Sequence, residues 1–298
     1  MRVPAGTRTH ALSTMESKSG PWWGGAATRV TFWSGAIPGG ALFGKSEDRD
    51  DYQVTPGPVA AMARDLPDGH VIAPHRHRRA QLIYGTSGAI TVTTGAGSWV
   101  VPPNRAVWVP AGVRHSMRTS GPVTMRTLYV EQDARPWLPA ACTVVAVSAL
   151  LKELIEAATR IPVDHDAEGR DGKVLSLLLD ELEPVAVPAL HLPMPDDPLV
   201  APICAEIAER PGEAGTLQEW AERSYVSRTT LARRFRQATG YSLGRWRQQA
   251  LLLAAVRMLA ERRPVTEVAA ELGYDSPSAF TAMFTRALGV RPSRYFET

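Results

Sequence analysis

The sequence predicts an α+β protein in which a small β-barrel or sandwich precedes an all-α domain with two helix-turn-helix units. Three observations support this fold class. Short alternating runs rich in β-branched and aromatic residues fill residues 57–130, apolar residues recur at helical spacing from about residue 148, and the C-terminal third contains an internal repeat. Alternation with a period of two is typical of strands, whereas recurrence at three and four residues is typical of helices.

Length and composition limit the classes of protein to which this chain can belong. With 298 residues and 44% hydrophobic content, it can form about two globular domains with buried cores. No apolar run reaches the roughly 18 residues of a membrane span, so we expect no membrane partner. The N-terminus lacks the continuous apolar segment of a secretory signal, and Cys142 and Cys204 lack the spacing of a disulfide framework or zinc site. We therefore expect a cytoplasmic protein.

The N-terminal half divides into two regions of different composition. Residues 1–56 are rich in glycine and proline and contain aromatic residues without a visible period, so we expect a mostly disordered tail. Residues 57–140 contain short β-rich runs, for example 89–94 and 106–109, separated by glycine and proline. Several short strands at intervals of about ten residues predict a small barrel or sandwich.

A helical linker and a proline-rich connector fill residues 141–196. Two amphipathic segments carry apolar stripes, which consist of Leu150, Leu151, Leu154, Leu175, Leu178 and Leu179. The prolines of the connector are Pro184, Pro188, Pro193, Pro195 and Pro198. Because proline cannot extend a helix and stiffens a linker, they indicate a boundary before a separate domain at residues 197–298.

The C-terminal repeat pairs Ala221 with Ala269 at an offset of 48 residues, and Gly240 with Gly289 at an offset of 49. The change in offset corresponds to one extra residue in the second turn. Each copy is predicted to form a helix, a short turn and a second helix, with bounds of 217–224 and 227–239, then 266–272 and 276–288. The paired glycines stand where a helix ends in a left-handed residue. A long helix over 243–260 connects the copies.

The second helix of the first copy has an arginine-rich outer face. Its buried stripe consists of Leu231, Phe235 and Ala238, and Ser227 precedes it as an N-cap. The predicted exposed residues are Arg228, Thr229, Ala232, Arg233 and Arg236. Residues 198–298 contain 14 arginines and no lysine against 10 acidic residues, so positive charge concentrates there. Arginine and short polar side chains on such a helix suit the major groove of DNA.

Residues 217–298 resemble the double helix-turn-helix domain of AraC/XylS-type transcription regulators. The segments that carry the resemblance are 227–235 (SRTTLARRF), 239–243 (TGYSL), 268–274 (VAAELGY), 280–284 (FTAMF) and 288–295 (LGVRPSRY). The resemblance implies a double-stranded DNA operator as partner, with RNA polymerase as a further possible one. It also implies base reading by Thr229, Ala232 and Arg233 in the first unit and by Pro277, Ser278, Thr281 and Ala282 in the second.

Three positions depart from the family pattern. Tyr225 replaces the usual glycine of the first turn, so the backbone must avoid or strain a left-handed angle. Leu251 replaces an arginine of the connecting helix, and Ala282 replaces a common arginine of the second reading helix. We therefore expect the second unit to read fewer bases directly than the first.

A cluster of histidines marks the predicted barrel. His75 and His77 lie two residues apart, so their side chains point to the same face of a strand. Together with Gly69, Gln81, Gly88 and His115 they resemble the two sequence motifs of cupins, with Gln81 in the position of the usual metal-binding glutamate. The resemblance implies a metal set of His75, His77, Gln81 and His115, whereas we expect His70 to be an ordinary strand residue.

Two interpretations of this cluster remain open. The three imidazoles and the amide oxygen could hold a divalent metal such as Zn, Ni, Fe or Mn, although the missing carboxylate should weaken binding. Alternatively, His75, His77 and His115 could line the mouth of an effector pocket together with Tyr84 and Trp108, either of which could equally belong to the core.

Residues 57–298 as a whole resemble the AraC-type subgroup with an N-terminal cupin sensor. The resemblance implies a sequence-specific transcription regulator, not an enzyme, whose barrel binds a small-molecule effector. It also implies dimerisation through the helices of residues 148–183, although their apolar stripes could instead cover the barrel. The main alternative is a metal-dependent cupin enzyme fused to a DNA-binding module, and a third is a constitutive DNA binder without an effector.

Overall fold

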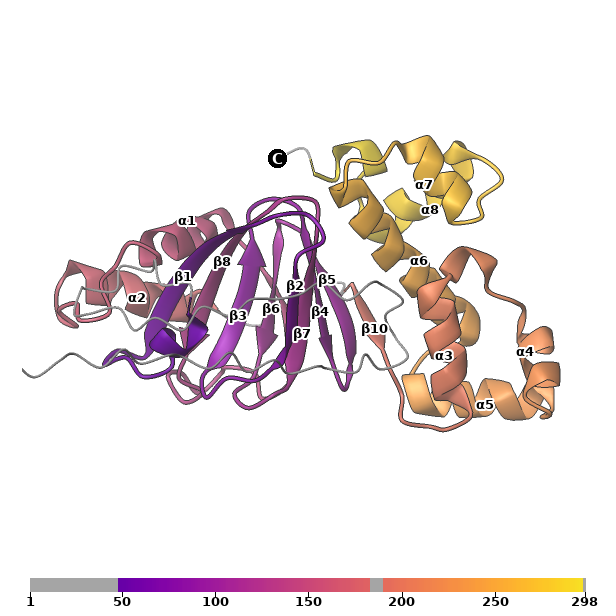
Figure 1. Ribbon diagram of the computed structural model, residues 1–298, viewed down its shortest axis with the longest axis horizontal. Helices are drawn as coiled ribbons and strands as arrows, with labels where there is room; N and C mark the ends of the chain where they lie inside the picture. Colours follow the sequence, from indigo (N-terminus) through magenta and orange to yellow (C-terminus); the bar gives the residue numbers. More distant parts are fainter. Residues whose placement is uncertain (1–47, 183–189, 297–298) are drawn as a thin grey trace, which may run out of the picture. The chain divides into compact units, whose positions relative to one another are not determined.

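The computed structural model describes residues 48–182 and 190–296, and it contains the predicted β-region followed by helices (Figure 1). Most of the expected tail, residues 1–47, lies outside the described residues, as do Pro184 and Pro188. The last part of that segment is packed, because a 3-10 helix spans Arg49–Tyr52 and Tyr52 is fully buried. Tyr52 stacks on Tyr129 with a centroid distance of 5.7 Å, so the folded chain begins earlier than expected.

The described strands form two five-stranded antiparallel sheets. Sheet A has the order β1-β8-β3-β6-β9, and its strands are β1 (Val59–Leu66), β8 (Val123–Val130), β3 (Ala80–Gly85), β6 (Arg105–Val109) and β9 (Thr143–Ala146). Sheet B has the order β10-β5-β4-β7-β2, and its strands are β10 (His191–Pro193), β5 (Gly97–Val101), β4 (Ala89–Thr94), β7 (His115–Ser120) and β2 (Val71–His75). This arrangement confirms the predicted barrel-like β-domain.

Side chains that alternate along the strands separate the inside of this domain from its outside. On β3, Ile83 faces an inner core that includes Val107 of β6 and Tyr129 of β8. Tyr84 on β3 and Trp108 on β6 belong instead to an outer cluster. Successive residues of a strand point to opposite faces, and this parity decides which residues can meet in the interior.

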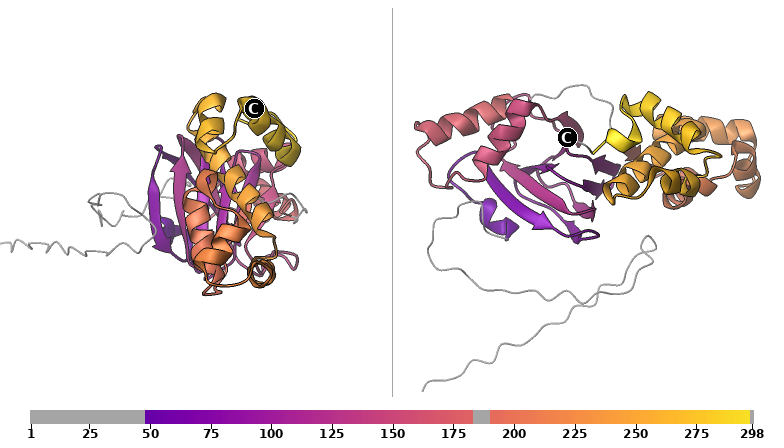
Figure 2. Two further views of the ribbon diagram at one scale, coloured as in Figure 1. Left: turned by 90° about the vertical axis from the view of Figure 1, so that its right-hand side faces the viewer. Right: turned by 90° about the horizontal axis from the view of Figure 1, so that it is seen from above.

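Helices α1 (Ala149–Ala158) and α2 (Arg170–Asp180) cover the outer face of sheet A (Figure 2). The buried members of their stripes pack against the outer cluster; they are Leu151, Leu154, Leu175, Leu178 and Leu179. By contrast, Leu150 and Leu177 remain 48% and 44% exposed. The stripes therefore do cover the sheet, but two apolar side chains are left on the outer surface of the helices. No helix of the described chain is long and apolar enough to cross a membrane.

The C-terminal helices confirm the two helix-turn-helix units. They follow α3 (Val200–Glu209) and consist of α4 (Leu217–Arg223), α5 (Arg228–Thr239), α6 (Leu243–Ala260), α7 (Val265–Glu271) and α8 (Pro277–Leu288). The hydroxyls of Ser227 and Ser276 cap α5 and α8 by accepting from backbone amides three residues on. Gly240 and Gly289 end these helices with φ angles of 78° and 77°. Caps and C-terminal glycines thus lie where the repeat predicts them.

Both units share one core that is built around α6. Phe235 of the first unit and Phe284 of the second are fully buried in the same cluster as Trp246 of α6. Leu251, which replaces the usual arginine, is only 8% exposed and belongs to this cluster too. The substitution at position 251 therefore exchanges a charged side chain for a packed one.

The connector between the two domains contributes a strand to sheet B. β10 pairs with the edge of β5, and the ring of its first residue, His191, stacks on Trp99 at 4.4 Å. Its last residue, Pro193, accepts a 3.0 Å hydrogen bond from the indole Nε1 of Trp246. Proline is tolerated here because β10 is an edge strand, where one side needs no ladder hydrogen bonds.

The two turns have the same backbone but different residues. Tyr225 and Gly273 occupy equivalent positions, with φ angles of 54° and 75°. In each turn the amide donates to a carbonyl three residues earlier, at 3.1 Å from Tyr225 to Glu222 and 3.0 Å from Gly273 to Ala270. From the sequence, the backbone at Tyr225 was expected either to avoid a left-handed angle or to adopt it with strain. The structure shows that Tyr225 adopts the left-handed angle. Its side chain is 97% exposed and contributes little packing to offset the strain.

Candidate metal centre and nucleic-acid interface

The strand pairing brings the predicted metal ligands together. His75 ends β2 directly opposite His115, which begins the neighbouring strand β7. His77 follows in the connection to β3, and Gln81 projects from β3 at only 1% exposure. One ligand atom from each of the three histidines lies within 4.8 Å of the others. The three histidines thus lie close together, and Gln81 lies beside them, with its Oε1 2.9 Å from Nε2 of His115.

Backbone carbonyls fix which nitrogen of each ring faces the centre. The Nδ1 atoms of His75 and His115 lie 2.7 and 3.0 Å from the carbonyl oxygens of Ala73 and Val113. Because a carbonyl oxygen can only accept, each neutral ring donates from Nδ1 and turns the lone pair of Nε2 inward. A histidine that binds a metal through one ring nitrogen typically donates a hydrogen bond from the other nitrogen. This hydrogen bond sets both the tautomer and the orientation of the ring.

Gln81 is oriented in the same way. Its amide Nε2 donates to the hydroxyl of Thr127 at 2.9 Å, and that hydroxyl donates to the carbonyl of Leu82 at 2.9 Å. The amide oxygen Oε1 is thereby turned toward His115, whose Nε2 lies 2.9 Å away. Two acceptor atoms facing each other at this distance repel unless a proton or a cation lies between them. The arrangement therefore favours a bound cation.

The separations within the cluster suit a metal ion. Nε2 of His75 lies 3.1 Å from Nε2 of His77. Ligand atoms about 2.0–2.1 Å from a tetrahedral ion are about 3.3 Å apart, so this separation is close to the requirement. His77 is 4% exposed, and its Nδ1 has no hydrogen-bond partner in the part of the chain that the structure describes.

The imidazoles are neutral at pH 7 and so available as ligands. Burial lowers the pKa of His75 to about 4 and that of His77 to about 3. Burial also lowers the pKa of His115. Because only neutral imidazole can bind a metal, these shifts remove proton competition at neutral pH.

Arg49 is a positive charge that acts on this site and that the sequence did not reveal. Its positive charge lowers the pKa of all three histidines, in addition to burial. Arg114 is a further positive charge that lowers the pKa of His75. Arg49 lies in the segment expected to be a tail, where no motif or period gives a signal.

Tyr84 and Trp108 do not share a mouth with the histidines, which corrects the expected grouping of five effector residues. Both lie in the outer cluster beneath α1 and α2, whereas Gln81 and the histidines belong to the inner face. Trp108 donates from its indole Nε1 to the carbonyl of Pro139 at 2.8 Å. The physical reason is strand parity, because Tyr84 is three residues from Gln81 and so points to the opposite face. His70, which directly precedes β2 rather than lying within a strand, is also outside the metal cluster.

The predicted DNA-reading residues of α5 form one exposed face. The exposed residues are Arg228, Thr229, Ala232, Arg233 and Arg236. Arg234, by contrast, is engaged within the protein, where its guanidinium donates to the carboxylate of Asp197 at 2.7 Å. On α8, Pro277, Ser278 and Ala282 are exposed and Thr281 is half-buried. The arginine side chains therefore concentrate on α5 rather than α8.

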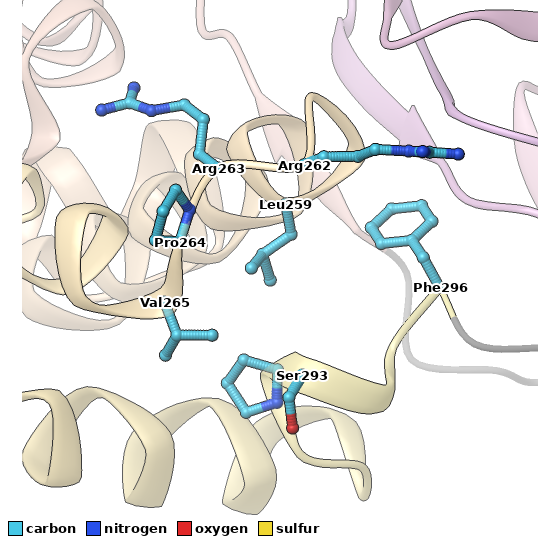
Figure 3. Close-up of a pocket in the computed structure, with 8 residues that line it drawn as sticks. Leu259, Arg262, Arg263, Pro264, Val265, Ser293 and Phe296 are labelled. Atoms are coloured by element: carbon cyan, nitrogen blue, oxygen red, sulfur yellow. The ribbon is translucent and has the colours of Figure 1, made fainter.

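A separate hollow of about 380 Å³ lies in the helical domain (Figure 3). It is bounded by the end of α6, the start of α7 and the 3-10 helix Pro292–Arg294. Its guanidinium groups come from Arg262 and Arg263, and Arg263 is paired with the carboxylate of Glu271. It lacks the convergence of donor atoms found at the histidine cluster, which we therefore take as the candidate centre.

Comparison with known proteins agrees with both halves of the architecture. Residues 58–181 match the family described as AraC-like ligand binding domain, and residues 220–298 match the family described as helix-turn-helix domain. The chain is similar to the HTH-type transcriptional regulator NimR of Escherichia coli (strain K12), with 37% identity over 221 residues that cover 74% of this chain and 81% of NimR. RipA of Corynebacterium glutamicum is 33% identical over 107 residues, 34% of this chain and 32% of RipA.

Among solved structures, the DNA-binding domain of AdpA in complex with a target DNA is 37% identical, with a TM-score of 0.32, and covers 34% of this chain and 92% of that domain. The decisive similarity is to NimR, since it extends through most of both sequences. Because the ligand-binding and helix-turn-helix families match in the order predicted from the residues, the chain belongs to the AraC family of transcriptional regulators.

Proposed function

We propose that the β-domain of this regulator is a metal-dependent sensor whose state controls reading of an operator by α5 and α8. The observation that carries the proposal is the orientation of the donors in the cluster. His75 and His115 each turn an Nε2 lone pair inward, and Gln81 turns its amide oxygen toward the same point. Lone pairs that face one another at hydrogen-bond distance repel unless a proton or a cation lies between them, and a cation satisfies all of these donors at once.

The donor chemistry favours Zn, Ni, Fe or Mn. Imidazole nitrogen suits Zn, Ni and Fe, and an amide oxygen is acceptable to Mn as well. His75, His77, His115 and Gln81 would hold the ion, which would supply a Lewis-acidic point for effector binding. The chain's own residues keep the rings neutral, fix their tautomers and exclude water from one side, because His77 and His115 are 4% and 2% exposed.

The side chains around the histidine cluster favour a sensor over the alternative of a metal-dependent enzyme. General acid–base catalysis usually needs a carboxylate, histidine or similar group that can transfer a proton to the substrate. Here the charged side chains of other residues that lower the pKa of His75 are Arg49 and Arg114, and guanidinium is not among the usual proton-transfer groups. Iron in the purified protein together with oxygen consumption would instead support the enzyme.

Metal binding is tested by removing one ligand from the full chain. We expect about one equivalent of metal in the wild type and in His70→Ala, a histidine outside the cluster, measured by elemental analysis after dialysis against Zn, Ni or Mn. His115→Ala should lose affinity by more than about 100-fold, exceeding the 10–100-fold typical of residues that only orient a ligand. Equal metal content in His115→Ala and wild type would contradict the proposed centre.

We also propose that the regulator acts as a homodimer through the outer surface of α1 and α2, in the cytoplasm, with RNA polymerase as a further partner at the promoter. The support is the exposed pair Leu150 and Leu177, which lies on helices whose other leucines are buried. Paired subunits would also match paired operator half-sites.

The dimer contact is tested by introducing charge at that surface. Leu150→Glu combined with Leu177→Glu should convert a dimer into a monomer in sedimentation equilibrium, because two desolvated carboxylates would face a partner copy. Val71→Glu is the matched control, since Val71 is 57% exposed on β2, away from both helices. A wild type that sediments as a monomer, or a charged variant that stays dimeric, would refute this contact.

A further inference from the structure

Tyr225 lies in the turn of the first helix-turn-helix unit and adopts a backbone angle that favours glycine. Its φ is 54°, and it is one of two non-glycine residues with positive φ in the part of the chain that the structure describes; the other is Arg262. An L side chain strains this angle, because its Cβ approaches the following carbonyl oxygen. A strained residue that persists at a binding surface is a candidate for a functional role.

The fold itself does not require a tyrosine at this position. Its side chain is 97% exposed, and among the described residues it has no partner in a hydrogen bond or ring contact. At Gly273, the equivalent residue of the second unit, an added Cβ would lie 2.9 Å from the carbonyl oxygen of Gly212. The second turn therefore has room only for glycine, whereas the first turn directs a large side chain into open space.

The turn holds Tyr225 at the N-terminal end of the reading helix. Its amide donates to the carbonyl of Glu222 at 3.1 Å, which fixes the turn on α4. Two residues later, Ser227 caps α5. Because a reading helix contacts base edges with its N-terminal residues, a side chain just before its cap lies beside the groove, where the sugar–phosphate backbone runs.

The charges around this end of α5 favour a phosphate. The helix contains four arginines and no acidic residue. The two carboxylates of α4 are engaged toward the start of that helix: Glu219 accepts from the amide of Thr216 at 2.7 Å, and Glu222 accepts from Nε2 of Gln218 at 2.6 Å. A tyrosine hydroxyl is among the groups that donate to phosphate oxygens at protein–DNA interfaces.

We propose that the hydroxyl of Tyr225 donates a hydrogen bond to an operator phosphate beside the groove that α5 reads, and so positions this helix on the duplex. The inference rests on the proposed reading of the operator by α5, and it adds a backbone contact that the second unit, with Gly273, lacks. A phosphate contact fixes the register of a helix without preferring a base. The contact formed in the complex offsets the strain that Tyr225 imposes on the free protein.

Tyr225→Gly separates fold from function, because its two expected effects have opposite directions. Glycine relieves the left-handed strain, so the urea midpoint of the full chain, followed by circular dichroism, should rise above that of the wild type. Operator affinity should nevertheless fall about 10-fold, because the hydroxyl is lost. A glycine variant no more stable than the wild type would mean that contacts within the protein hold the side chain, which overturns the argument from strain.

Tyr225→Phe removes the hydroxyl alone and keeps the ring. Affinities are measured by fluorescence anisotropy for an operator selected from random duplexes and for a scrambled duplex of the same length. We expect a loss of about 10-fold on both, the range for a hydrogen bond to a charged group. The salt dependence should not change, because a neutral donor displaces no counter-ions. Tyr241→Phe is the matched control, since it removes a hydroxyl beyond Gly240, at the other end of α5.

The outcomes distinguish this contact from the alternatives. Wild-type affinity of Tyr225→Phe for the operator would overturn the phosphate contact, also where the variant impairs transcription by added RNA polymerase, since the partner would then be a protein. A loss confined to the operator would overturn it too, because Tyr225 would then read a base. If the wild type selects no operator from random duplexes, the proposed function itself fails.

Discussion

Replacing Phe284 with alanine is expected to destabilise the helical domain by about 3–5 kcal/mol, the usual cost of deleting a buried aromatic ring. The ring is fully buried and contacts Phe280 and Tyr295 at centroid distances of 5.7 and 5.2 Å. Phe235→Ala, at the equivalent position of the first unit, should cost a similar amount. Both units pack on α6 within one cluster, so either substitution should lower a single cooperative transition of the whole domain.

Chemical denaturation followed by circular dichroism measures this loss. Val290→Ala is the control, because Val290 is 41% exposed just beyond α8 and its truncation should change the free energy of unfolding little. If Phe284→Ala unfolded the second unit alone while the first retained its stability, the shared core would not couple the two units as inferred.

Arg233→Ala is expected to weaken operator binding by about 1–3 kcal/mol, which is about 5–150-fold, if Arg233 contacts a guanine through two hydrogen bonds. Arg233 is exposed on α5, whereas its neighbour Arg234 is paired with Asp197 and so occupied within the protein. Because a direct base contact is lost, specificity should also relax at one operator position.

An operator selected from random duplexes with the wild-type protein provides the probe, and fluorescence anisotropy at fixed salt provides the affinity. Gln237→Ala is the matched control, since Gln237 is an exposed polar residue of the same helix outside the predicted reading face. Unchanged affinity of Arg233→Ala for the selected operator would remove Arg233 from the set of base readers.

The helical domain could be predicted closely from the sequence because its signals are local. A cap such as Ser227, a C-terminal glycine such as Gly240 and the apolar spacing between them lie within one helix. The repeat then supplied a second, independent copy of the same pattern. The strain at Tyr225 was likewise readable, because the position demands a left-handed angle whichever residue occupies it.

The site was predictable only in part. Motif spacing placed the three histidines and Gln81 together, and strand pairing does bring them together. The error at Tyr84 and Trp108 could have been avoided by counting strand parity from Gln81. The contribution of Arg49 could not be predicted from the sequence, because the position of its segment depends on the contact of Tyr52 with Tyr129, which lies far along the chain.

The pairing of β10 with β5 determines where a chimaeric regulator can be joined. The proline-rich connector suggests a junction between Pro184 and Pro188, where the sensor would be fused to a foreign DNA-binding domain. Such a junction would remove β10 from the sheet to which it belongs. The hydrogen-bonding edge of β5 and the face of Trp99 would then be uncovered, which invites association between chains. A sensor transplanted onto a foreign DNA-binding domain should therefore carry its own chain through Pro193.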